Sequence, residues 1–277
     1  MTRFERPESM AEATSLLATG DWVPLAGGTD LYPAQVGRTM PRPLLDLSRV
    51  AGLRGIRQGD DGWSIGATTT WTDVIRADLP PLFDALKAAA REVGGVQIQN
   101  AGTVAGNVCN ASPAADGMPV LLALGAEVEL CSTIGSRRLP LEAFVLGSRR
   151  TARRGDELVT ALHIPSRSPR ARSVFAKLGG RRYLVISIAM VAVVVDVDDE
   201  GRVIDAGVAV GSCSAVAKRL PSLEARLTGH DVAEPGGRVE ADDLAPLAPI
   251  DDVRASAGFR RDATLTLLRR ALAALAP

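Results

Sequence analysis

Two glycine-rich segments contain the residues whose types and spacing suit the binding of a phosphate group. The first reads Ala26-Gly27-Gly28-Thr29-Asp30-Leu31, and the second, NAGTVAGNVCNASPAAD, runs from Asn100 to Asp116. Paired glycines let the backbone turn with positive φ and approach a ligand closely. Amides that point outward at the start of a helix can then bind a phosphate oxygen. Taken by itself, the first segment is also explained by an ordinary strand–turn–helix connection.

The second segment adds side chains that donate hydrogen bonds. Its candidate donors are Thr103, Asn107, Asn110 and Ser112, and Asp116 is suited to hold a sugar hydroxyl. Because the segment has few large apolar residues, it predicts a long loop over 100–113. Loops longer than about 12 to 15 residues are usually functional or disordered, and the apolar segments on both sides favour function. Since neither segment carries a metal-binding motif, the pair suits a pyrophosphate held by backbone amides.

Other kinds of catalytic site are excluded by the motifs and residue types of the chain. There is no GxGxxG after a strand, no phosphate-binding GxxxxGK[ST] loop and no GxSxG nucleophile turn. His163 and His230, the two histidines, cannot form an HExxH zinc site. Cys109, Cys131 and Cys213 are odd in number and far apart, which argues against a disulfide framework and against an iron–sulfur cluster with its roughly four ligands. Redox chemistry would therefore need an organic cofactor.

Composition narrows the classes of partner. The 277 residues include 32 basic and 32 acidic ones, so no basic surplus favours nucleic acid or an anionic membrane. The longest apolar run, 183–195, is shorter than the roughly 20 residues that span a bilayer. No apolar segment follows the charged start of the chain, so no signal peptide is visible. We expect a soluble cytoplasmic protein that binds neither nucleic acid nor membrane.

Hydrophobic periodicity predicts α+β elements around the two segments. Strands are expected at 22–26, 44–47, 53–57, 63–67, 127–131, 158–164, 173–178, 186–197 and 203–210, with a hairpin turn at 59–62. Helices are expected after a Ser9 cap to 17, from Thr29 toward 35, after a Thr70 cap to 76, and at 82–93, 114–124 and 251–275. The proline-rich stretch 165–170 is the best linker candidate. This pattern predicts two domains that meet near residues 165–171.

Four parts of the chain resemble one family. The two glycine-rich segments closely resemble those of the flavin-binding subunit of the molybdenum-containing hydroxylases, the xanthine dehydrogenase and carbon monoxide dehydrogenase flavoprotein family. Phe175-Ala-Lys177-Leu-Gly-Gly-Arg181-Arg182 resembles the family's entry to its C-terminal domain, and Ser256-Ala-Gly-Phe-Arg-Arg261 with Arg269-Arg270 resembles its last helix. The resemblance implies a vanillyl-alcohol-oxidase (PCMH)-type FAD-binding domain over 1–168, with two subdomains split near residue 50. It also implies a small C-terminal α+β domain over 169–277, with a three-stranded antiparallel sheet and helices.

The resemblance further implies a division of labour between subunits. A molybdopterin-containing large subunit would hydroxylate the substrate, and an iron–sulfur small subunit would carry two 2Fe-2S clusters. This chain would pass electrons from those clusters through FAD to NAD+ or another acceptor, in a dimer of heterotrimers. The alternatives are a self-sufficient flavoprotein oxidase or dehydrogenase, a subunit of an aldehyde-, aromatic- or CO-oxidising relative, and a scaffold that has lost FAD.

The family's cofactor-binding residues are carried over to matching positions of this chain. They are Ala26, Gly27, Gly28, Thr29, Asp30 and Leu31 on one side of the pyrophosphate, Thr103, Gly106, Asn107, Cys109 and Asn110 on the other, Asp116 at a sugar hydroxyl, and Lys177 beside the flavin ring. A cation there could stabilise the anionic reduced flavin. The alternative for Lys177 is a solvated strand lysine, and for Cys109 a small buried thiol.

The chain departs from the family pattern at two positions, and it also contains one cluster of arginines. Ala105 stands where relatives often have a second glycine, and Val185 stands where many have an acidic residue, which leaves the electron acceptor open. The arginines of 149–154 are interpreted as a solvated turn, with docking to a partner chain as the alternative.

Overall fold

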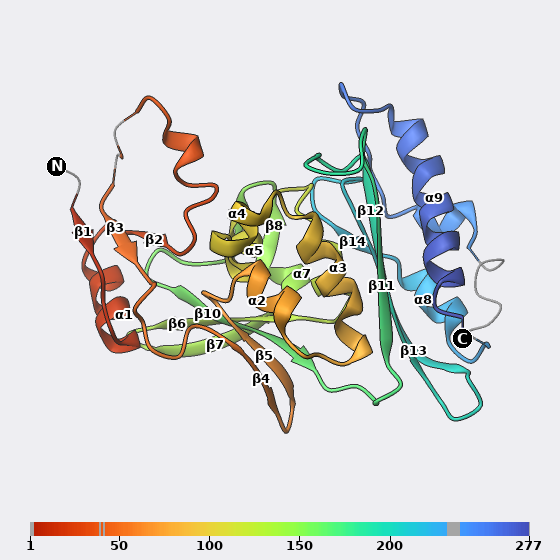
Figure 1. Ribbon diagram of the computed structural model, residues 1–277, viewed down its shortest axis with the longest axis horizontal. Coiled ribbons are helices and arrows are strands. Elements are labelled where there is room, and N and C mark those ends of the chain that lie inside the picture. Colours follow the sequence, from red (N-terminus) through yellow and green to blue (C-terminus); the bar gives the residue numbers. More distant parts are fainter. Residues whose placement is uncertain (1–2, 39, 41, 232–238, 277) are drawn as a thin grey trace.

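The computed structural model describes residues 3–38, 40, 42–231 and 239–276, and Figure 1 shows their arrangement. At the N-terminal end, three short strands form a parallel sheet in the order β1-β3-β2. These elements are β1 (Phe4–Glu5), α1 (Met10–Thr19), β2 (Val23–Leu25) and β3 (Leu44–Asp46). The Ser9 hydroxyl accepts from the amide of Glu12 and caps α1, as predicted. Toward residue 35 the expected helix is a 3-10 turn, Pro33–Gln35.

A five-stranded antiparallel sheet follows, in the order β4-β5-β10-β6-β7. Its strands are β4 (Ile56–Gly59), β5 (Gly62–Gly66), β6 (Glu127–Ser132), β7 (Gly135–Pro140) and β10 (Leu158–Pro165). The hairpin predicted around 59–62 is present, because Gly59 pairs with Gly62 across the turn. A separate small hairpin joins β8 (Val145–Gly147) to β9 (Arg150–Thr151).

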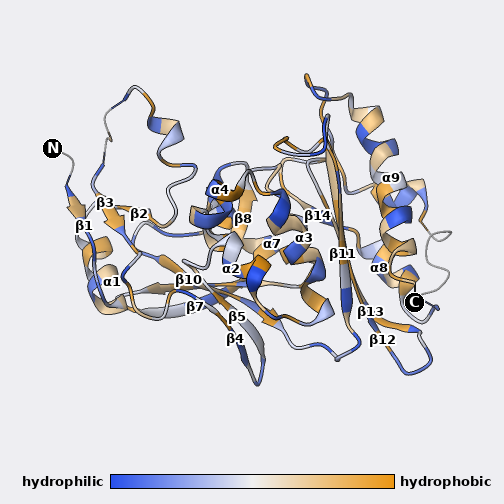
Figure 2. Cartoon of the chain, viewed as in Figure 1, coloured by the Kyte–Doolittle hydropathy of each residue, from blue (hydrophilic) through white to orange (hydrophobic). Residues whose placement is uncertain are grey.

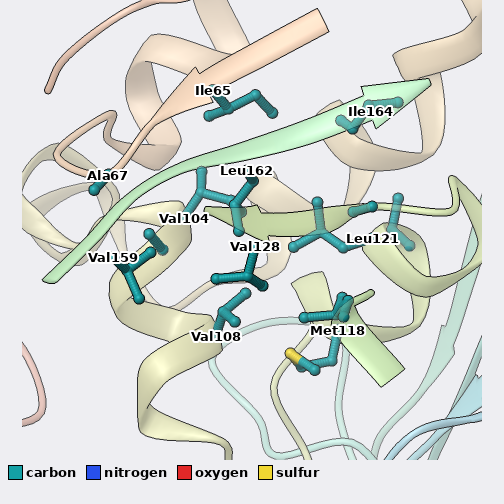
Figure 3. Close-up of a cluster of buried hydrophobic side chains, with 14 of the residues drawn as sticks. Ile65, Ala67, Val104, Val108, Met118, Leu121, Val128, Val159, Leu162 and Ile164 are labelled. Carbon is teal, nitrogen blue, oxygen red and sulfur yellow. The ribbon is translucent and has the colours of Figure 1, made fainter. Parts of the chain in front are cut away.

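Short helices lie between this sheet and the C-terminal sheet (Figure 1). They are α2 (Trp71–Arg76), α3 (Asp84–Glu92), α4 (Val96–Ala101), α5 (Val104–Asn110), α6 (Gly117–Ala123) and α7 (Leu141–Phe144), with a 3-10 turn at Pro81–Phe83. Figure 3 shows side chains of α5 and α6, Val104, Val108, Met118 and Leu121 among them, packed beside the sheet residues Val128 and Leu162. This packing supplies the core beneath the glycine-rich segments.

The long loop predicted over 100–113 is wrong. Half of that stretch is α5, and its first two residues end α4. The start of α5 is capped by the Thr103 hydroxyl, which accepts from the amide of Gly106 at 3.0 Å. The buried side of the helix is formed by Val104, Ala105 and Val108. Small apolar residues at this spacing form a narrow stripe, and tertiary packing rather than propensity makes so short a helix stable.

The C-terminal sheet is antiparallel, in the order β11-β12-β13-β14. Its elements are β11 (Arg172–Leu178), β12 (Ala189–Val197), β13 (Val203–Gly211), β14 (Lys218–Arg219), α8 (Pro221–Leu227) and α9 (Ala257–Ala273), with a 3-10 turn at Ala241–Leu244. The short β14 adds a fourth strand to the three that were predicted. The last helix begins at Ala257 rather than 251, because the Ser256 hydroxyl accepts from the amide of Phe259.

Strand β12 is apolar except for Asp196 because the sheet is covered on both faces. All nine of its residues are buried. Ala192 and Val194 belong to the core shared with the helices of the N-terminal part, whereas Val191 and Val193 face the core beneath α8 and α9. Figure 2 shows the hydrophobic colour along this sheet and on α9. The N-terminal helices therefore pack against one face of the C-terminal sheet.

Candidate functional site

A cavity of about 970 Å³ lies between the two glycine-rich segments. Its size is at the upper end of the range typical of small-molecule and cofactor sites. With the exception of Lys177, it is lined by every residue that the sequence identified as cofactor-binding: Ala26, Gly27, Gly28, Thr29, Asp30, Leu31, Thr103, Gly106, Asn107, Cys109, Asn110 and Asp116. Tertiary structure thus brings together residues that lie up to 90 positions apart in the chain.

The first segment turns sharply after β2 and leaves its amides unbonded. In the part of the chain that the structure describes, no acceptor is found for the amides of residues 27–31. Gly28 has a φ of +68°, and a Cβ there would lie 2.5 Å from the ring of Tyr32. A Cβ on Gly27 would lie 1.9 Å from the carbonyl oxygen of Ala101, so this glycine is where the two segments touch. Such a run of free amides is suited to bind an anion.

A hydrogen bond joins the second segment to the first, and the second segment also contributes an unpaired hydrogen-bond acceptor. Asn110 Nδ2 donates to Asp30 Oδ1 at 2.9 Å. Asn107 Oδ1 is buried and has no hydrogen-bond partner among the residues that the structure describes, although a buried polar atom is normally paired. A cofactor that offers phosphate oxygens to the free amides and a hydroxyl to Asn107 fits both features of the cavity wall. The donor set therefore fits a nucleotide-type cofactor.

Asp116 is buried at the start of α6, in contact with the C-terminal domain. Its carboxylate accepts from Lys177 Nζ at 3.0 Å and from Ser187 Oγ at 2.9 Å, and it is 8% exposed. Burial raises the pKa of the Asp116 carboxyl above its usual value, although the Lys177 ammonium opposes the shift. The ion pair joins helix α6 to strand β11, so it connects the two halves of the chain beside the cavity.

Lys177 itself lies in the wall of a neighbouring cavity of about 420 Å³. Its side chain is 7% exposed, and Glu92 Oε2 lies 3.9 Å from Nζ, so the alternative of a solvated strand lysine is wrong. Glu92 and Val185 line both cavities. The position where relatives have an acidic residue is thus an apolar part of the boundary between the two spaces.

Two expectations for single residues are corrected by the geometry of the cavity. Cys109 is an exposed thiol on the cavity wall rather than a buried one, because Val108 takes the buried side of α5. Arg149 and Arg153 also line the cavity, so the arginine cluster is more than a solvated turn. The sequence signals a cluster of charges at 149–154, but it does not indicate which of the side chains turn inward.

Among the described residues there is no group of three or more His, Cys, Asp or Glu side chains placed to hold a metal ion. A search of the same residues found no helix with the length and apolar character needed to cross a bilayer.

Comparison with known proteins identifies the family. Residues 1–167 match the family model described as the FAD binding domain in molybdopterin dehydrogenase, and residues 175–275 match the CO dehydrogenase flavoprotein C-terminal domain. The nicotine 6-hydroxylase medium subunit of Paenarthrobacter nicotinovorans is 30% identical over 275 residues, which are 98% of this chain and 95% of the relative. The xanthine dehydrogenase FAD-binding subunit of Escherichia coli O157:H7 is 35% identical over 166 residues, 58% of this chain and 57% of that one.

Solved structures agree with the sequence relatives. A carbon monoxide dehydrogenase structure from Hydrogenophaga pseudoflava superimposes with a TM-score of 0.87 at 28% identity, covering 98% of this chain and 96% of that chain. The family and the fold class expected from the sequence are thereby confirmed. The chain belongs to the family of FAD-binding subunits of the molybdopterin dehydrogenases, and FAD is its cofactor.

Proposed function

We propose that this chain is the FAD-carrying subunit of a multi-subunit molybdenum hydroxylase. It takes electrons from the 2Fe-2S clusters of a partner and delivers them to NAD+ or another acceptor. The observation that carries the proposal is the cavity of about 970 Å³, whose walls combine both glycine-rich segments of an FAD-binding domain. The relatives of this chain are named as medium or FAD subunits of dehydrogenases and hydroxylases. Bound FAD supplies the electron-transfer chemistry, and the protein supplies binding, orientation and electrostatics.

Each site residue has a role in this proposal. The pyrophosphate is held by the backbone of residues 26–31 on one side and by residues 103–110, from Thr103 to Asn110, on the other. Gly106 allows close approach of the backbone, and Asn107 and Asn110 offer side-chain contacts. Cys109 forms part of the cavity wall. Asp116 holds a sugar hydroxyl, and Lys177 lies toward the edge of the flavin ring. The free amides of residues 27–31 and the unpaired Asn107 Oδ1 support these roles.

The partners follow from the family. We propose an iron–sulfur small subunit and a molybdopterin large subunit, assembled as a dimer of heterotrimers in the cytoplasm. We also propose that the FAD-binding domain comprises 1–168, divided near residue 50, and that the C-terminal domain comprises 169–277. The two matched family ranges, 1–167 and 175–275, support this boundary.

The experiment is purification of the full chain with and without its co-expressed partners. We expect the isolated chain to carry FAD but no iron or molybdenum, and the complex to contain both metals. Substrates such as N-heterocycles and aldehydes should reduce the flavin in the complex and leave it oxidised in the isolated chain. Bleaching of the flavin by substrate in the isolated chain would instead identify a self-sufficient flavoprotein oxidase. A chain purified without FAD that does not take it up would refute the proposal.

A further inference from the structure

Two guanidinium groups face the FAD cavity without a carboxylate partner. They belong to Arg149 and Arg153, and both side chains line the cavity. The other cation in its wall, Arg42, forms an ion pair with Asp21 at 2.7 Å. No carboxylate within salt-bridge distance is found for Arg149 or Arg153 among the residues that the structure describes. Their positive charges are therefore available to an anion in the cavity.

Arg149 is held next to the first glycine-rich segment. It lies in the tight turn between β8 and β9 with a φ of +59°, and its amide donates to the carbonyl of Ala111, at the end of α5, at 3.0 Å. Its guanidinium contacts Asn110 Oδ1, and Asn110 Nδ2 donates to Asp30 Oδ1 at 2.9 Å. A left-handed conformation costs free energy in a residue other than glycine, and here it places the guanidinium against Asn110, whose amide nitrogen holds Asp30 of the first glycine-rich segment.

Arg153 is fixed by the turn that follows β9. Its Nη1 donates to the carbonyl oxygens of Glu157 at 2.7 Å and Arg154 at 3.1 Å. The buried Glu157 carboxylate accepts from Arg137 Nε at 2.6 Å and from the amide of Arg154 at 2.8 Å, which ties the turn to β7. One edge of the Arg153 guanidinium is thus occupied by carbonyls, and its remaining N–H groups have no partner within the described part of the chain.

The cavity wall also contains the carboxylates of Asp30, Glu92 and Asp116. Asp30 accepts from Asn110 Nδ2, and Glu92 Oε2 lies 3.9 Å from Lys177 Nζ. The carboxylate of Asp116 is already paired with Lys177 at 3.0 Å, and the backbone amides of the glycine-rich segments carry no net charge. The pyrophosphate of FAD carries two negative charges. Guanidinium groups bind phosphate oxygens through paired, charge-assisted hydrogen bonds. We propose that Arg149 and Arg153 bind the pyrophosphate of FAD and supply the two positive charges that the amides lack. This inference rests on the proposed function, because it assigns the cavity to FAD.

The test measures binding of FAD and of riboflavin, which lacks phosphate, to the flavin-free full chain by quenching of flavin fluorescence. The variants are Arg149→Gln, Arg153→Gln and the double variant. The matched control is Arg150→Gln, since Arg150 is exposed on the same hairpin and does not line the cavity. Thermal unfolding of each flavin-free variant checks that the fold is intact.

We expect each single variant to bind FAD about tenfold more weakly and the double variant about a hundredfold more weakly, as for hydrogen bonds to charged groups. Riboflavin affinity should stay the same, and Arg150→Gln should match the wild type for both ligands. Added salt should weaken FAD binding of the wild type more than that of the double variant, because salt screens exposed charges.

Two results would overturn the inference while the wild type still binds FAD. One is an unchanged FAD affinity in the double variant, which would return these arginines to a role in docking a partner chain. The other is an equal loss of riboflavin affinity, because the effect would then not act through phosphate. Failure of the wild type to bind FAD at all would refute the proposed function itself, so the two failures are distinguishable.

Discussion

Replacement of Lys177 by methionine removes the cation from a buried ion pair and keeps the apolar part of the side chain. Lys177 Nζ lies 3.0 Å from Asp116 Oδ2, and the two side chains are 7% and 10% exposed. At this distance and an effective dielectric constant of about 20, the Coulomb attraction is roughly 5 kcal/mol. Desolvation of both ions offsets part of it, and removal of one partner from such pairs costs about 3–5 kcal/mol. We expect Lys177→Met to lower the free energy of unfolding by about 3 kcal/mol at pH 7.

The pH dependence of this loss has a definite sign. Burial already raises the pKa of Asp116 in the folded chain, and loss of the lysine raises it further. The folded variant therefore binds a proton at a higher pH than the unfolded chain, whose aspartate pKa is about 3.9. Its stability falls as the pH rises through this interval. The deficit relative to wild type should thus be largest at neutral pH and should shrink as the pH falls toward 4.

Urea unfolding of the flavin-free chain, followed by tryptophan fluorescence, measures both effects. A double-mutant cycle with Asp116→Asn isolates the pair, and we expect a coupling free energy of about 2 kcal/mol. A change of less than about 0.5 kcal/mol in the unfolding free energy of Lys177→Met, the range of ordinary surface substitutions, would show that the ion pair does not stabilise the fold. A deficit that grows as the pH falls would contradict the expected direction of the Asp116 pKa shift.

Three further substitutions test other parts of the structure. Gly27→Ala should lower Tm and FAD occupancy more than Gly28→Ala, because the Cβ at Gly27 meets a backbone carbonyl at 1.9 Å whereas that at Gly28 meets the side-chain ring of the half-exposed Tyr32. The reverse order would contradict the geometry. Arg260→Lys should lower Tm by about 5 °C, because the buried guanidinium loses hydrogen bonds to two carbonyls and a carboxylate. The control Arg270→Lys, at an exposed position, should leave Tm unchanged, and equal effects of the two substitutions would disprove the prediction. Glu157→Gln should be destabilising at pH 7 and less so near pH 3, because Arg137 lowers the pKa of the Glu157 carboxyl to about 2. A lowered pKa stabilises the fold above the unfolded value of about 4.3, and this stabilisation is lost as the pH falls through about 2. A deficit that does not depend on pH in urea titrations would contradict this prediction.

Local features of the chain were predictable from the sequence because they depend on neighbouring residues. Thr70 caps a helix that runs over Trp71–Arg76 through a reciprocal contact with Asp73 three residues later. The turn at 59–62 is determined by glycine spacing, and Gly62 adopts a φ of +131°. Residue types alone indicated that the two glycine-rich segments suit a phosphate group, and both segments line one cavity.

The sequence also determined the family, because its glycine-rich motifs let the backbone approach a cofactor closely in the way that is typical of that family. It did not determine the structure of the second segment, where packing of Val108 against the sheet stabilises a helix that composition disfavours. Nor did it reveal that Lys177 lies against Asp116, because 61 residues separate them and an ion pair depends on where β11 meets α6. Arg149 lines the cavity and its neighbour Arg150 does not. Side-chain direction in a tight turn follows from the backbone conformation and from the contact with Ala111, and only the folded chain brings those atoms together.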